Sequence, residues 1–150
     1  MKRPKFEIDI DLGDFEQEVV ETAMQAYYRA LELTTMDAVG NIRRESPVDQ
    51  GRLAGSFLPE KEDPLIWHIR SGVEYALWVH DGTGVYGPQG QPITPVSANA
   101  LVFEGEDGSL VVTRSVLGQE PNPYADRALT VTADRVNEFI RRALREVSGA

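Results

Sequence analysis

The side chains best suited to chemistry lie around position 80. His80 and Asp81 are adjacent, and Tyr75 lies five residues before His80. An aspartate that orients a histidine is the arrangement of a general base. The segment is predicted as a strand, however, on which neighbouring side chains face opposite ways, and it offers no nucleophile. The pair therefore does not favour an enzyme, and we expect no catalytic residue.

Two further patterns resemble cofactor and metal sites. Gly82-Thr-Gly-Val-Tyr-Gly87 matches the GxGxxG motif of dinucleotide-binding folds. Pro88 and Pro92 follow where the phosphate-binding helix has to begin, so we attribute the match to chance. His68 and His80 are the only histidines, and without a clear third ligand they do not predict a zinc site. We expect neither a cofactor nor a metal.

The segment Tyr75-Ala-Leu-Trp-Val-His-Asp-Gly-Thr-Gly84 is predicted to be a structural anchor. The apolar run from Ala76 to Val79 is long enough to enter a core, so Tyr75 and Trp78 are expected to be buried. Gly82 and Gly84, on either side of Thr83, then allow the backbone to leave this segment as a loop.

That loop runs from Gly82 to Asn99 and is dense in glycine and proline, which argues against regular structure. Loops of this length in a compact domain are usually functional or become ordered on assembly. We expect the loop to reach another chain. Its predicted contact residues are Val85, Tyr86, Pro88, Pro92 and Ile93.

Two helices are predicted. Apolar residues recur at steps of three and four between positions 15 and 42, which indicates a helix at 14–45 that ends before Pro47. A turn follows, in which Asp49 accepts backbone hydrogen bonds and Gly51 takes a conformation that other residues resist, before Arg52. Pro123 suits the first turn of a second helix at 123–147.

The predicted strands lie at 6–12, 65–70, 100–104 and 109–113. The first alternates apolar and acidic side chains, and the last two form a hairpin around Gly105–Gly108. Residues 59–64 are expected to form a charged turn. Together the elements predict an α+β fold, a mainly antiparallel sheet with a long N-terminal helix and a C-terminal helix packed on one face.

Composition sets outer limits on function. The 150 residues fit one domain, from which the loop at 82–99 projects. There is no cysteine for a disulfide or a thiolate metal site. The net charge of -9 disfavours sequence-independent binding to nucleic acid. No segment approaches the ~20 apolar residues of a membrane span, and the N-terminus is not that of a secretory signal. A soluble protein made in the cytoplasm is expected.

Four short motifs occur in a characteristic order: Ser46-Pro-Val-Asp-Gln-Gly-Arg-Leu53, Tyr75-Ala-Leu-Trp-Val-His-Asp-Gly-Thr83, the hairpin at Ala100–Gly108, and Gly118-Gln-Glu-Pro-Asn-Pro-Tyr124. Together they resemble the minor-tail or neck proteins of long-tailed bacteriophages, also called tail-completion or head-tail joining proteins. Members of that family usually carry threonine at the position of Gln50 and glutamate at the position of Asp81.

The resemblance implies a structural virion protein at the neck or the head-proximal end of the tail, assembled in the host cytoplasm. Its expected partners are copies of itself in a ring, six-fold as in such tails, and the neighbouring head-closure and tail-tube proteins. DNA would pass through the lumen without specific binding, and no membrane is involved. Two alternatives stay open: a tail terminator that caps the tail tube, and a small binding or regulatory module outside the virion.

Overall fold

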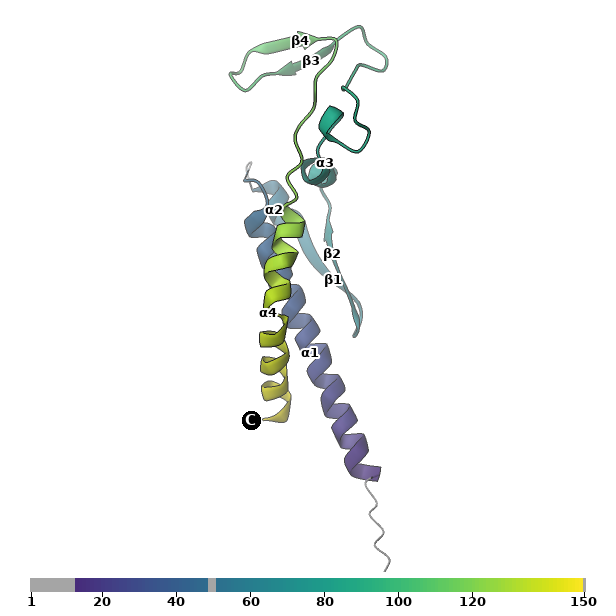
Figure 1. Ribbon diagram of the computed structural model, residues 1–150, viewed down its shortest axis with the longest axis vertical. Helices are drawn as coiled ribbons and strands as arrows, with labels where there is room; N and C mark the ends of the chain where they lie inside the picture. Colours follow the sequence, from purple (N-terminus) through teal and green to yellow (C-terminus); the bar gives the residue numbers. More distant parts are fainter. Residues whose placement is uncertain (1–12, 49–50, 150) are drawn as a thin grey trace, which may run out of the picture.

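A computed structural model describes residues 13–48 and 51–149. The molecule is elongated (Figure 1). Two long helices fill one end, a small hairpin stands at the other, and short elements connect them. In chain order the elements are α1 (Gly13–Glu45), α2 (Arg52–Ser56), β1 (Phe57–Asp63), β2 (Ile66–Ser71), α3 (Tyr75–Asp81), the 3-10 turn η1 (Gly84–Tyr86), β3 (Leu101–Glu104), β4 (Leu110–Thr113) and α4 (Tyr124–Ser148).

The helices α1 and α4 run antiparallel and form the main contact of the fold. Small buried side chains, among them Ala26 and Ala30 on α1 and Ala143 on α4, let the two backbones approach closely. A buried hydrogen bond from Asn41 Nδ2 to Thr132 Oγ1 (2.9 Å) helps to set the register near the C-terminal end of α1.

Ion pairs repeat this register towards both ends of the helix pair. Arg29 Nε lies 2.6 Å from Glu146 Oε2 at one end, and Arg127 Nε lies 3.0 Å from Glu45 Oε2 at the other. At exposed positions such pairs contribute little energy. Their value here is that they fix which turns of the helices face each other.

The hairpin β1–β2 lies against the upper part of α1. Its strands are antiparallel, with Phe57 opposite Ser71 and Lys61 opposite Trp67. Arg43 Nη2 on α1 donates a 2.7 Å hydrogen bond to the carbonyl of Phe57, which ties the strand to the helix. The core lies where α1, α2, β1, α3 and α4 meet, and comprises Ile42, Leu53, Phe57, Ala76, Tyr124 and Ala128.

The α+β class, the long N-terminal helix and the C-terminal helix are confirmed. The strands predicted at 65–70, 100–104 and 109–113 do not share one sheet, because within the described residues β1 pairs only with β2 and β3 only with β4. Residues 59–64, predicted as a charged turn, supply most of β1. A hairpin with much of its surface in water needs no apolar alternation, so periodicity did not reveal this strand. The strand predicted at 6–12 lies outside the described residues.

The segment predicted as a strand around Tyr75 is the short helix α3. Alanine and leucine near its start favour helix, and the run is too short for its period to be read with certainty. No helix in the described part of the chain is long and apolar enough to cross a membrane.

Candidate functional site

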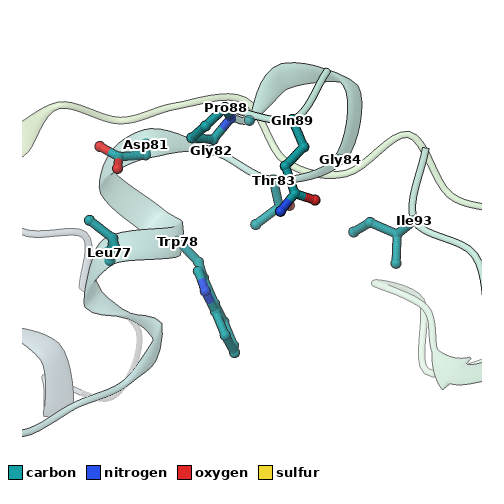
Figure 2. A pocket seen from close by; sticks show the side chains of 10 residues that line it. Leu77, Trp78, Asp81, Gly82, Thr83, Gly84, Pro88, Gln89 and Ile93 are labelled. Carbon is teal, nitrogen blue, oxygen red and sulfur yellow. The ribbon is translucent and has the colours of Figure 1, made fainter. Parts of the chain in front are cut away.

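An open pocket of about 350 Å³ lies between α3 and the start of the long loop (Figure 2). Figure 2 shows the Trp78 indole hanging from α3 along one side, with Ile93 on the opposite side and Gln89 and Thr83 above. Asp81 lies on the rim and is the one ionisable side chain that the described residues contribute to the lining. The full lining is Leu77, Trp78, Asp81, Gly82, Thr83, Gly84, Gly87, Pro88, Gln89 and Ile93.

Trp78 is exposed, which corrects the prediction that it is a buried anchor. Its exposed fraction is 57%, and that of Leu77 beside it is 62%. Helical geometry explains the difference, because Tyr75, Ala76 and Val79 share the face that packs on the core. Residues 77, 78 and 81 therefore point away from it. The anchoring role predicted for this segment holds for Tyr75, which is partly buried against the core.

The wall of the pocket is held by a second segment, residues 117–119. The Thr83 backbone N–H donates to the Gln119 carbonyl at 2.9 Å, and the Val85 N–H donates to the Leu117 carbonyl at 2.7 Å. The Gln119 N–H in turn donates to Thr83 Oγ1 at 2.9 Å. This part of the loop is ordered by its own chain, whereas the sequence led us to expect order from a neighbour.

Two glycines allow the segments to approach so closely. Gly84 has φ of 64° and Gly118 has φ of 96°, both in the left-handed region. A Cβ on Gly84 would overlap the carbonyl of Leu117, and a Cβ on Gly118 would overlap the carbonyl of Thr83. Glycine is required at both positions for this backbone contact. The contact between the loop and residues 117–119 was not predicted from the sequence.

The predicted contact residues of the loop divide into two groups. Pro88 and Ile93 line the pocket, and the Ile93 backbone also forms a two-way bridge with Val116. Tyr86 is exposed, Val85 is half-buried, and neither they nor Pro92 belong to the pocket lining.

The other predicted motif residues have structural positions. Gly51 precedes α2 with φ of 68°, Arg52 begins that helix at an exposed position, and Pro123 precedes α4. Gly82 is buried against Gln119 and Pro121. Asp49 lies outside the described residues.

His80 and Asp81 do meet, contrary to the argument from a strand. His80 Nδ1 lies 2.7 Å from Asp81 Oδ1, and His80 Nε2 faces Asp126 Oδ2 at 3.7 Å. Within the described part of the chain Nε2 has no hydrogen-bond partner. The His80 ring packs edge-on against Tyr124, with 5.4 Å between ring centroids. These contacts join α3 to the start of α4.

Tyr124, the first residue of α4, adds a second contact to the junction between α3 and α4. Its hydroxyl donates a 3.0 Å hydrogen bond to the carbonyl of Ala76, and burial, aided by the negative charge of Asp81, raises the pKa of its phenol. Tyr124 is the last residue of the fourth motif, and no role was predicted for it. Its position directly after Pro123, at the start of a predicted helix, was the one feature of the sequence that could have indicated this role.

No known protein family, curated protein or solved structure matches this chain. Among residues 13–48 and 51–149, no group of three or more histidine, aspartate or glutamate side chains is placed to hold a metal ion.

Proposed function

We propose that this protein is a structural component of a tailed bacteriophage, which joins copies of itself into a ring at the neck or the head-proximal end of the tail. The observation that carries the proposal is the pocket beside α3. It presents the exposed side chains of Leu77 and Trp78 on a backbone that is already fixed. Large aromatic side chains in such settings are typical of the central residues of protein interfaces.

The positions of the resembling motifs support this proposal. Motifs separated by more than 30 residues meet in space, because the Asn122 N–H donates to the Val79 carbonyl at 3.0 Å and Tyr124 bonds to Ala76. Leu53, from the first motif, belongs to the same core. Three of the four motifs therefore form one structural unit, and the pocket lies on its exposed surface. The remaining motif, the hairpin at Ala100–Gly108, lies outside this unit.

The chemistry of the pocket indicates a protein partner. Its walls combine an indole, aliphatic side chains and backbone, with one carboxylate at the rim. This suits an apolar side chain of a neighbouring copy, inserted against Trp78 with a polar or basic group near Asp81. Apolar groups exposed together on a soluble protein commonly mark an interaction site.

Trp78→Ala tests the proposal. Because the indole is exposed, the variant should keep the wild-type circular dichroism but lose at least ~10-fold in ring affinity, the ~1.4 kcal/mol or more expected of an interface tryptophan. Light scattering after size exclusion measures the mass, and electron microscopy shows the rings. Val96→Ser is the matched control, because Val96 lies in the same loop, is fully exposed and does not line the pocket.

Two results would contradict the proposal. One is a wild-type protein that stays monomeric at all concentrations, alone and with phage tail or head-closure proteins. The other is a Trp78→Ala variant that forms rings as readily as Val96→Ser.

A further inference from the structure

A second surface lies at the opposite end of the molecule, where α1 extends beyond α4. Because Arg29 pairs with Glu146 close to the end of α4, residues 13–25 of α1 project past that end (Figure 1). The projecting segment is about 20 Å long at 1.5 Å per residue. It exposes Val19, Val20 and Met24, with exposed fractions of 49%, 60% and 39%. A helix with such a face is ordinarily packed against something.

A groove on the same side of the helix pair leads to this projection. It has a volume of about 260 Å³ and is lined by residues of α1, β2 and α4. Its lining is mostly apolar and comprises Thr34, Thr35, Ala38, Trp67, Ile69, Leu129, Thr132, Ala133 and Val136.

The groove continues as an apolar stripe along both helices. On α1, Val20, Tyr27 and Thr34 recur every seven residues, so they share one side of the helix. On α4, Ile140 and Leu144 follow Val136 at steps of four, and both are exposed. Projection, stripe and groove thus form one continuous apolar face.

The charges beside this face are of opposite sign on the two helices, acidic on the projecting part of α1 and basic on the last turns of α4. The described α1 residues before Arg29 include no base, and Glu16 and Glu21 border Val20 on the helix surface. On α4, Arg141 and Arg145 directly follow Ile140 and Leu144. Neither arginine pairs with a carboxylate among the described residues, whereas Arg142 pairs with Glu146 at 2.7 Å.

We propose that the projecting α1 segment of one copy, residues 13–25, packs along the α4 stripe and groove of a second copy. Glu16 and Glu21 would then lie near Arg141 and Arg145 of the other chain. The segment cannot occupy its own groove, because it is a straight continuation of α1 that leads away from α4. This contact is separate from the pocket beside α3 and does not depend on the proposed function.

A charge exchange tests the contact. Glu16→Lys with Glu21→Lys in one chain, and Arg141→Glu with Arg145→Glu in another, should each raise the self-dissociation constant at least ~10-fold, because like charges then meet. Mixing the two variants should restore association, since each lysine pair then meets a glutamate pair. Sedimentation velocity over a concentration series measures this, and high salt should weaken the restored contact.

Glu18→Lys is the matched control, because Glu18 lies on the opposite side of α1 from Val20 and should leave association unchanged. Charge variants that associate like the wild type, or a mixture that fails to recover, would overturn the inference. So would loss of association on deleting residues 1–12, since this would make the N-terminal segment the occupant of the groove. Trp78→Ala cannot be rescued by the exchange, so the two surfaces are tested separately.

Discussion

At the scale of single residues, the backbone crossing at Gly84 and Gly118 does most to define the site. The glycines of the loop and their conformational freedom are evident from the sequence, but not the contact of Gly84 with Gly118, which belongs to another segment. A glycine in the sequence shows that the backbone can adopt a positive φ at that position. It does not show which other segment of the chain will pack against it. The exposure of Trp78 was not predicted for a similar reason. In an apolar run this short, the sequence does not indicate which side chains face the core.

Gly84→Ala should destabilise the protein by about 2–3 kcal/mol, since the methyl group meets the Leu117 carbonyl and adds to the cost of a left-handed backbone. Gly90→Ala is the matched control. Its φ is 62°, and a Cβ there meets nothing within 4 Å, so only the backbone cost of about 1 kcal/mol remains. Urea denaturation measures both variants, and equal losses would show that the crossing is not tightly packed.

At the scale of elements, the two long helices were predictable to within a residue at most ends. Their apolar residues repeat over many turns, and Pro47 and Pro123 mark the boundaries. The strands β2, β3 and β4 were also found. Neither β1 nor α3 was, because β1 has a polar sequence on an exposed hairpin and α3 has only seven residues. Sheet organisation was not predictable, since alternation along a strand does not identify its partner.

The stability of the junction between the middle of α1 and the end of α4 should depend on pH. Hydrogen bonds from Arg29 and Arg142 lower the pKa of Glu146 below its ordinary value of 4.5. The unfolded chain therefore takes up a proton at Glu146 before the folded chain does. The stability that Glu146 contributes is fully present above pH 4.5 and is lost as the pH falls through the lowered pKa.

Glu146→Gln should accordingly be less stable than the wild type at neutral pH, and the difference should shrink in the acid range below the ordinary pKa of glutamate. Urea denaturation from pH 7 down to pH 3 measures this difference. Glu18→Gln, a change at an exposed position with no ion pair in the described chain, serves as the control. A difference that stays constant with pH would show that the ion pairs are not formed in solution.

At the scale of the whole molecule, the core lies in the middle, and the hairpin β3–β4 stands apart from it (Figure 1). The hairpin exposes Val102, Phe103, Leu110 and Val112. An isolated two-stranded hairpin is only marginally stable in water. The sequence predicted this hairpin correctly but placed it in a shared sheet, whereas it forms a separate projection.

Replacing residues 101–113 with a short Gly-Ser linker should leave the remaining fold intact, because Leu101 and Thr113 are paired and the chain ends to be joined are already close. We expect the free energy of unfolding to change by less than about 1 kcal/mol, since no core residue is lost. Circular dichroism and thermal melting measure the outcome. A collapse of helix content would mean that the hairpin supports the core.

The antiparallel arrangement of α1 and α4 gives the molecule a direction. The described chain begins and ends on the side of the projecting helix, while the hairpin marks the other side (Figure 1). In the proposed assembly, copies that stack in one sense would all present the projecting helix on the same side. A label attached at the C-terminus would mark that side of every copy, and it would show whether successive copies point the same way.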